Sequence, residues 1–286
     1  MVIRKPGMKE LFTLIRSARH CTVLTGAGVS TLSGIPDFRG ALPEELTGKF
    51  ASGVVELYLS GLEDLPPKTA GDPAPFFLFP EKVFDSRRFE EDPAFFYRVA
   101  GPLVYSLDTK EPSVVHRVLA AAERQGMVKS VITQNIDMLH RKAGTKRLIE
   151  LHGSPGIHYC LRCPGIRLSY AGAAAALRAG DMPRCPRCNR ILKPAITFYG
   201  DPLPLEARRA AEAEAQDADL MLVLGTSLEV FPAADLPRTV LRRGGRIVIV
   251  NRRRTFLDGY ARIRLWDLEQ TFTGLENYVK DPGHAP

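Results

Sequence analysis

Continuously apolar, strand-like runs alternate with helical patterns along most of this chain, and this alternation limits the fold more than any other feature. A strand that is apolar at every position must be covered on both faces, as in a parallel sheet between two layers of helices. The sequence therefore predicts an α/β fold, a Rossmann-like parallel sheet with helices on both faces. The expected strands are 21–25, 130–133, 147–151, 220–224 and 246–250, and the expected helices are 8–19, 113–125, 136–143, 204–215 and 233–243.

Polar or glycine-rich clusters follow the predicted strands. Because the carboxyl ends of parallel strands meet at one edge of a sheet, where ligands bind, we expect these clusters to form a nucleotide site. Glycine-rich backbone after the first strand can approach a pyrophosphate, although Gly-x-Gly without a third glycine is equally typical of a tight turn. The clusters are Gly26-Ala27-Gly28, Gln134-Asn135-Ile136-Asp137, His152-Gly153, Gly225-Thr226-Ser227 and Asn251.

Four of the five cysteines form two C-x-x-C pairs, Cys160 with Cys163 and Cys185 with Cys188. Each pair can hold a metal from one tight turn, and four thiolates complete a closed tetrahedral zinc site. Such a zinc is structural, because no coordination position is left for a substrate. A redox pair or two disulfides are the alternatives. We expect Cys21, beside an apolar strand, to be a small buried hydrophobe.

The composition is that of an ordinary globular protein, with 45% apolar and 25% charged residues among 286. No apolar run approaches the ~20 residues that span a bilayer, and the first residues lack a secretory signal. We therefore expect a cytoplasmic protein with no membrane partner. The net charge of +7 and the arginine clusters at 242–243 and 252–254 suit acidic or nucleic-acid-associated partners, although a solvated surface accounts for them as well.

Two stretches interrupt the alternation of strands and helices. Residues 41–90 are rich in proline, glycine, phenylalanine and leucine, and residues 154–195 carry the cysteine pairs. Both are typical of insertions that pack together as a smaller zinc-binding domain. The predicted Rossmann-like, nucleotide-binding domain is 1–40, 103–153 and 196–286, and the predicted small domain is 41–102 and 154–195.

A series of motifs resembles a known family. In order along the chain, "GAGVSTLSGIPDFRG", "TQNIDMLHRKAG", "ELHGS", the two C-x-x-C pairs, "KPAITFYGD", "GTSLEVFPAADLP" and "IVIVN" are similar to the successive motifs of the sirtuins, which are NAD-dependent protein lysine deacylases. The resemblance extends from about residue 8 to about residue 270. It implies NAD and Zn as cofactors and an acyl-lysine protein or peptide as substrate, bound in a cleft between the two domains.

The resemblance also implies a role for each matching residue. Residues implied to contact NAD are Gly26, Ala27, Gly28, Ser30, Asp37, Phe38, Arg39, Gln134, Asn135, Ile136, Asp137, Gly225, Thr226, Ser227, Asn251 and Arg252. Those implied to clamp the peptide as an added strand are Thr197, Phe198, Tyr199, Gly200, Glu229, Val230 and Phe231. The implied zinc ligands are Cys160, Cys163, Cys185 and Cys188.

The family's reaction needs a base that removes a proton from a ribose hydroxyl. A neutral imidazole, with a pKa near ~6.5, suits that task at neutral pH. His152, at a strand end before Gly153, is the candidate base, and Asn135 is the second candidate catalytic residue. We expect His116 and His140, which lie in helical patterns, to have packing or hydrogen-bonding roles.

The sequence departs from the family pattern in its insertion and near its peptide clamp. The segment 40–83 is roughly thirty residues longer than usual, a length that commonly marks a lid or binding loop. Asp201 stands where a glutamate is more common, and Ala195 where an Asn or Asp is common. These departures affect the expected closure of the cofactor loop and details of the substrate clamp.

The resemblance also bears on the acyl group. Sirtuins that prefer acidic acyl chains share a Tyr-x-x-Arg pair, whereas here Tyr97 is followed three residues later by Ala100. Arg98 is adjacent to Tyr97, and neighbouring helical residues point about 100° apart. We therefore expect a preference for neutral acyl groups, acetyl first.

The function that these features favour is NAD-dependent removal of acyl groups from protein lysines, which combines transferase and hydrolase chemistry. A mono-ADP-ribosyltransferase is the first alternative, because it shares the release of nicotinamide. A non-catalytic, NAD-sensing zinc protein is the second, and the joint presence of His152, Asn135 and Asp137 argues against it.

Overall fold

The computed structural model describes residues 8–36 and 80–280. The chain divides into two compact units. The larger unit comprises Met1–Ile35, Lys110–His152 and Leu203–Pro286, and the smaller unit comprises Pro36–Thr109 and Gly153–Pro202. Asp37, Phe38, Arg39 and most of the 40–83 insertion lie outside the described residues.

A six-stranded parallel sheet forms the centre of the larger unit, in the order β3-β2-β1-β7-β8-β9. In the register of the sheet, Val23 of β1 pairs with Val131 of β2 and with Leu222 of β7. All five predicted strands are confirmed, whereas β9 was not predicted because three residues with a central arginine carry little strand signal. The strands are β1 (Cys21–Thr25), β2 (Ser130–Thr133), β3 (Leu148–Glu150), β7 (Leu220–Leu224), β8 (Arg246–Val250) and β9 (Ile263–Leu265).

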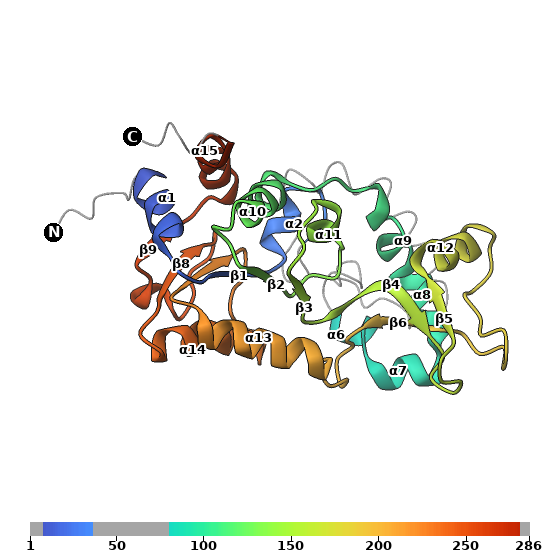
Figure 1. Ribbon diagram of the computed structural model, residues 1–286. Coiled ribbons are helices and arrows are strands. Elements are labelled where there is room, and N and C mark those ends of the chain that lie inside the picture. The colour runs from blue at the N-terminus through green and yellow to red at the C-terminus, as the bar shows by residue number, and fades with distance from the viewer. Residues whose placement is uncertain (1–7, 37–79, 281–286) are drawn as a thin grey trace, which may run out of the picture. The chain divides into compact units, whose positions relative to one another are not determined.

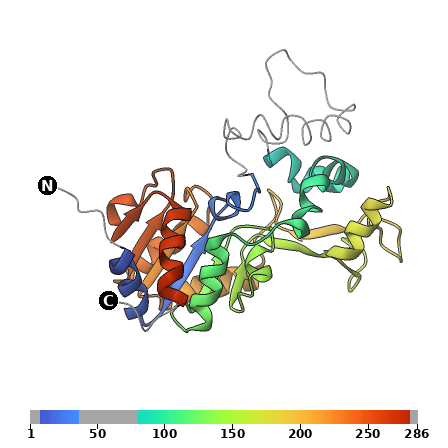
Figure 2. The same ribbon diagram turned by 90° about the horizontal axis from the view of Figure 1, so that it is seen from above.

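Helices cover both faces of this sheet (Figure 1). Along β7, Leu220, Leu222 and Leu224 belong to the same buried cluster as apolar residues of α1 (Met8–Ser17), α10 (Val114–Arg124) and α15 (Leu268–Lys280). The alternate residues Met221 and Val223 pack with α13 (Leu205–Asp217) and α14 (Leu236–Arg242) on the opposite face. Figure 2 shows α10 and α15 side by side on their face. The continuous apolar character of β7 thus reflects burial on both sides.

The helices differ from the sequence prediction in three places. The predicted helix 136–143 is only α11 (Leu139–Lys142), because Met138 adopts a left-handed conformation with φ 62°. The predicted helix 233–243 is a 3-10 turn, η2 (Ala233–Asp235), followed by α14. Helix α15 was not predicted. No helix within residues 8–36 and 80–280 has both the length and the apolar character required to cross a membrane.

The smaller unit is built on a three-stranded antiparallel sheet in the order β5-β4-β6. Its strands are β4 (Gly153–Tyr159), β5 (Arg167–Ser169) and β6 (Lys193–Ile196). Edge-to-face contacts join Phe84, Phe89, Phe96 and Phe198 into an aromatic core. Its helices are α6 (Pro80–Val83), α7 (Ser86–Glu91), α8 (Pro93–Val99), α9 (Gly101–Val104), the 3-10 turn η1 (Leu107–Thr109) and α12 (Tyr170–Arg178).

Candidate active site

Two glycine turns interlock at the carboxyl edge of the larger sheet. The Gly26 N–H donates to the Leu224 carbonyl (3.0 Å), and the Gly28 N–H donates to the Gly225 carbonyl (2.9 Å). A Cβ atom on Gly28 would lie 2.7 Å from Gly225 Cα, so a side chain there would collide with backbone. Gly225 itself has a φ of +61°, which favours glycine. The two turns therefore need glycine so that their backbones can touch.

A hydrogen-bonded group of three polar side chains lies beside these turns. Asn135 donates from Nδ2 to Ser30 Oγ (2.9 Å) and to the Gly26 carbonyl (3.0 Å). Ser30 in turn donates to Asp137 Oδ2 (2.5 Å), while the Leu139 N–H donates to Asp137 Oδ1 (2.8 Å). Burial raises the pKa of the Asp137 carboxyl, and these two hydrogen bonds oppose that shift. Ser30, Asn135 and Asp137 are thus held as one group next to the glycine turn. The positions of Asn135 and Asp137 after a predicted strand indicated this edge of the sheet, and Ser30 was implied by the resemblance.

The imidazole of His152 is oriented by the loop that carries Asn135. Its Nδ1 lies 2.7 Å from the Gln134 carbonyl oxygen. A carbonyl can only accept, so Nδ1 carries the hydrogen and Nε2 keeps its lone pair. Burial lowers the pKa of His152, and the hydrogen bond to Gln134 partly opposes this change. The ring is therefore held neutral with Nε2 free to accept a proton, which is the form required of a general base.

The other predicted nucleotide residues lie at the same edge of the larger sheet. Gln134 Nε2 donates to Thr226 Oγ1 (3.1 Å), which links the loops after β2 and β7. Asn251, after β8, is 9% exposed and donates from Nδ2 to the Arg253 carbonyl (3.0 Å). Arg252 is exposed, whereas Ile136 and Ser227 are partly buried. The predicted NAD-binding residues that the structure describes thus follow β1, β2, β7 and β8, and they lie at the same edge of the sheet.

The predicted peptide-binding residues lie in two segments, one in each unit. In the smaller unit, Phe198 is buried and Tyr199 is 52% exposed. The Tyr199 N–H donates to the Phe84 carbonyl (2.7 Å), and the Ser86 N–H donates to the Tyr199 carbonyl (3.0 Å). Both backbone groups of Tyr199 are therefore already paired, so an added strand would have to use its neighbours.

The segment of the larger unit that was predicted to bind the peptide is mostly at the surface. Glu229 is exposed and accepts a hydrogen bond from Ser227 (3.1 Å). Phe231 is 58% exposed, an unusual position for a large apolar ring, and a cis peptide bond follows it. Val230 is partly buried.

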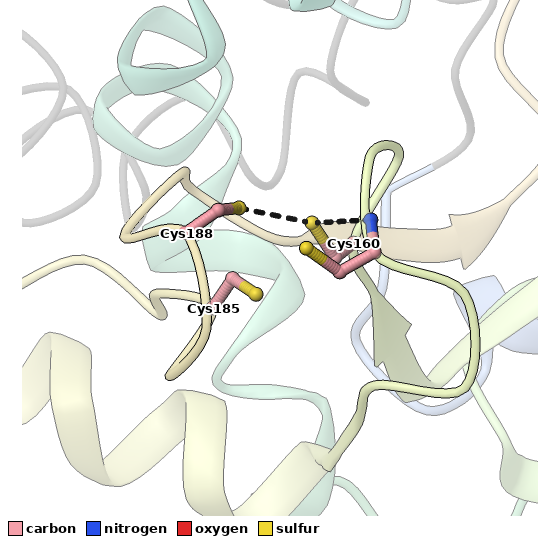
Figure 3. A group of neighbouring side chains, drawn as sticks. Cys160, Cys185 and Cys188 are labelled. Atoms are coloured by element: carbon pink, nitrogen blue, oxygen red, sulfur yellow. Dashed lines mark hydrogen bonds between the residues drawn. The ribbon is translucent and has the colours of Figure 1, made fainter.

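The side chains of Cys160, Cys185 and Cys188 point toward one another in the smaller unit (Figure 3), and Cys163 belongs to the same cluster. Their Sγ atoms all lie within 4.8 Å of one another, and the Sγ atoms of Cys160 and Cys188 are 3.6 Å apart. Tetrahedral zinc with Zn–S bonds of about 2.3 Å requires sulfur atoms about 3.8 Å apart, so the cluster fits this metal. All the cysteines are free thiols, and Leu192 packs against the cluster. The arrangement fits a closed structural zinc site rather than two disulfides.

Comparison with known proteins assigns the chain to a family. A family model described as the Sir2 family matches residues 72–232, which is more than half of the chain. The chain belongs to the Sir2 family. The sequence resemblance to the sirtuins is thereby confirmed.

Curated Sir2 relatives match nearly the whole chain. An NAD-dependent protein deacetylase of Thermotoga maritima is 38% identical over 257 residues, covering 90% of this chain and 92% of that protein. An NAD-dependent protein deacylase of Archaeoglobus fulgidus is 34% identical, covering 88% and 87%. Among solved structures, a Sir2 protein with a p53 peptide and NAD+ is 35% identical with a TM-score of 0.76, covering 97% of this chain and 99% of that one. A Sir2 protein bound to a propionylated peptide has the same TM-score and coverage at 34% identity.

Sequence reasoning missed several polar residues that support the site in this Sir2 chain. Thr25 and Thr133, at the ends of β1 and β2, join their hydroxyl groups at 2.9 Å. Thr133 Oγ1 also accepts a hydrogen bond from the Asn135 N–H (3.1 Å). The available signal was a threonine as the last residue of two adjacent buried strands.

Proposed function

We propose that this Sir2-family chain is an NAD-dependent protein lysine deacylase. The observation that carries the proposal is the geometry of His152 and Asn135: the neutral imidazole is held by the Gln134 carbonyl, and Asn135 is held by Ser30 on the glycine turn. A partly buried imidazole whose Nδ1 is held by a carbonyl and whose Nε2 keeps its lone pair is suited to take a proton from a bound substrate, which a module that only binds NAD does not require. The names of the relatives and the peptide complexes of the structural neighbours support the same reaction.

The proposal gives each group of residues a task. NAD, when bound, supplies a ribose carbon that accepts the acyl oxygen as nicotinamide departs. Asn135, Ser30 and Asp137 would orient that ribose and the nicotinamide amide, and the interlocked glycine turns would let backbone approach the pyrophosphate. His152 Nε2 would take the proton from a ribose hydroxyl. Gly225 to Ser227 and Asn251 would contact the adenosine end.

The two units suit two proposed domains. The larger unit (Met1–Ile35, Lys110–His152 and Leu203–Pro286) would form most of the nucleotide-binding domain that the sequence places at 1–40, 103–153 and 196–286. The smaller unit (Pro36–Thr109 and Gly153–Pro202) would contain the zinc-binding domain that the sequence places at 41–102 and 154–195. We place the protein in the cytoplasm, because a site of four thiolates requires reduced cysteines.

The proposed substrates are acyl-lysine segments of other proteins. The exposed side chains of Tyr199 and Phe231 would contact the peptide. The exposed arginines at 252–254 favour acidic or nucleic-acid-associated partners. Neither role requires a membrane.

Mass spectrometry of the products from NAD and an acetyl-lysine peptide tests the proposal. We expect free lysine, nicotinamide and O-acetyl-ADP-ribose in equal amounts. A gain in mass on a protein with the peptide still acetylated would instead identify an ADP-ribosyltransferase. Intact NAD and intact peptide would identify a non-catalytic NAD-binding protein.

A further inference from the structure

Two histidines that the proposed reaction does not use are packed together inside the larger unit. His116 of α10 is 0% exposed and His140 of α11 is 2% exposed, and their ring centroids lie 4.5 Å apart. The sequence suggested only packing or hydrogen-bonding roles for them. A buried pair of imidazoles is costly to keep unless the rings hold something in place, because each ring carries two polar nitrogens.

His140 lies at the start of a hydrogen-bond chain that ends at the backbone of Asn135. Its Nε2 is 3.0 Å from Thr25 Oγ1. The Thr25 hydroxyl donates to Thr133 Oγ1 (2.9 Å), which also accepts from the Asn135 N–H (3.1 Å). Since the Thr25 hydrogen points to Thr133, the bond between Thr25 and the ring is donated by His140 Nε2–H. This chain fixes the Asn135 backbone from the end of β2, the strand that precedes it.

His116 lies at the start of a second chain, which leads to the helix that carries Ser30. Its Nδ1 accepts from the Ser113 N–H (3.2 Å) and lies 2.7 Å from Ser113 Oγ. Because Nδ1 accepts, the single hydrogen of the Ser113 hydroxyl is shared between Nδ1 and the Val29 carbonyl (3.1 Å), which lies in the short helix α2 (Gly28–Thr31). Ser30, the next residue, accepts the Asn135 side-chain amide at 2.9 Å. The second chain therefore holds Asn135 from the side of the glycine turn.

The remaining nitrogens of the two rings are complementary. His116 Nε2 and His140 Nδ1 are both buried and have no hydrogen-bond partner among the described residues. Because Nδ1 of His116 accepts a hydrogen bond, Nε2 carries its hydrogen; because Nε2 of His140 donates, Nδ1 keeps its lone pair. Neighbouring rings thus present one donor and one acceptor, a pair that a single bridging water would satisfy. Burial lowers the pKa of both imidazoles, which keeps this neutral pairing in place.

We propose that His116 and His140 are positioning residues, which together set the position of Asn135 from both of its sides. Neither ring touches NAD or the acyl group in this proposal. His140 acts through Thr25 and Thr133 on the Asn135 backbone, and His116 acts through Ser113 and α2 on the Asn135 side chain. The effect on catalysis rests on the proposed deacylase function, whereas the effect on the Asn135 loop does not.

Replacing each histidine with glutamine and with asparagine distinguishes a role in hydrogen bonding from a role in packing. The amide of glutamine reaches the place of Nε2, and the amide of asparagine reaches the place of Nδ1. His140 uses Nε2 and His116 uses Nδ1. We therefore expect His140→Gln to keep kcat/KM for NAD within about twofold of wild type and His140→Asn to lower it about tenfold. At position 116 the order should reverse, with His116→Asn the better variant. Packing alone would favour glutamine, the larger side chain, at both positions.

A second readout does not depend on activity. Hydrogen exchange of the Asn135 backbone N–H, followed by NMR, should become faster in His140→Asn and Thr133→Val but not in His140→Gln or Thr133→Ser. If the histidine variants fold poorly, the threonine pair alone tests the chain, because valine matches threonine in shape and lacks the hydroxyl. The proposal would be overturned if the same amide, glutamine or asparagine, gave the higher kcat/KM at both positions. It would also be overturned if activity fell only in proportion to the folded fraction. Altered exchange without any deacylase activity in the wild type would overturn the proposed function and leave the positioning role standing.

Discussion

His152 combines a restrained ring with a free proton-accepting nitrogen. The Gln134 carbonyl holds Nδ1 at 2.7 Å, so removal of the ring should abolish the base and leave the sheet edge largely intact. We expect His152→Ala to lower kcat at least ~100-fold, the usual scale for loss of a general base, while NAD binding changes little. Steady-state kinetics and calorimetric titration with NAD measure the two quantities. His20→Ala, a histidine on the larger unit that pairs with Glu214, is the matched control and should keep full turnover. Normal deacylation by His152→Ala would remove this residue from the proposed role.

The pH dependence of the reaction follows from the same ring. A base works in its neutral form, so kcat/KM should fall as the pH drops through the pKa of His152. Burial lowers that pKa below its usual value near ~6.5, so the acid limb should lie below pH ~6.5. A pH–rate profile from about pH 4.5 to about pH 8 checks this, using an ionic-strength-matched buffer series. An acid limb centred above about pH 7 would contradict the assignment.

Tyr97 supports the expected preference for neutral acyl groups. Its hydroxyl donates to the Leu192 carbonyl (2.6 Å), and its ring is 3% exposed in the smaller unit. Arg98 points to the surface, where it pairs with Asp92 at 3.2 Å. Neither side chain is therefore placed to receive an acyl carboxylate, and an unpaired buried carboxylate costs several kcal/mol. On one peptide, we expect kcat/KM for succinyl-lysine to be at least ~10-fold below that for acetyl-lysine, a difference of about 1.4 kcal/mol. Equal kcat/KM values would show that another cationic side chain pairs with the succinyl carboxylate.

The individual site residues were partly predictable. His152, Asn135 and Asp137 stand out because they follow apolar strands, whereas Ser30 was implied only by the resemblance to the sirtuins. The hydroxyl groups of Thr25 and Thr133 did not stand out, because threonine is common in strands. Their contact exists only because β1 and β2 pair in parallel with Thr25 opposite Thr133. A contact between residues so far apart in sequence depends on strand register, which residue types alone do not reveal.

At the scale of single elements, the two C-x-x-C pairs, one directly after β4 and one before β6, allow a test of the structural role of zinc. A small unit that owes part of its folding to zinc should lose stability when a ligand is removed. We expect Cys185→Ser to lower the bound zinc from about one ion per chain to near zero and to expose the smaller unit to proteolysis. Metal content is measured with a chromophoric chelator, and cleavage sites are mapped by mass spectrometry. Cys21→Ala, which alters a buried cysteine of the larger unit, is the control and should keep its zinc. Loss of zinc without any change in stability or activity would contradict a structural role.

The elements themselves were predicted unequally. The buried parallel strands were found because they are continuously apolar, and the helices between them because of their periodicity. The antiparallel sheet of β4, β5 and β6 was missed, because β4 has the mixed sequence GSPGIHY rather than an apolar run, and β5 and β6 have only three and four residues. Gly153 shows how tightly that sheet is made: a Cβ there would lie 2.0 Å from the Ala195 carbonyl oxygen, and its φ is +66°. This close approach of two backbones depends on a single glycine, a residue that is equally typical of turns, loops and helix ends.

For the molecule as a whole, the buried histidine pair predicts sensitivity to acid in the larger unit. Burial lowers the pKa of His116 to about 4 and that of His140 well below its usual value. In the unfolded chain both titrate near ~6.5, so between that pH and about 4 the unfolded state binds protons that the folded state does not. The free energy of unfolding is therefore unaffected by protonation of these two histidines above pH ~6.5, and it decreases as the pH falls below that value. His116 alone should cost about 2 kcal/mol of unfolding free energy between about pH 7 and about pH 5.

Urea unfolding followed by the fluorescence of Trp266 measures this effect, because Trp266 is the only tryptophan and belongs to the larger unit. The wild type should lose several kcal/mol of stability between about pH 7 and about pH 5. His116→Asn keeps the contact with Ser113 but has no proton to gain, so its stability should fall less steeply over the same range. The two curves should converge as the pH decreases. The wild type loses unfolding free energy as His116 is protonated in the unfolded state, whereas the variant has no imidazole at this position. Parallel curves for the two proteins would mean that His116 is protonated equally in the folded and unfolded states, and burial would then not account for the acid sensitivity of this unit.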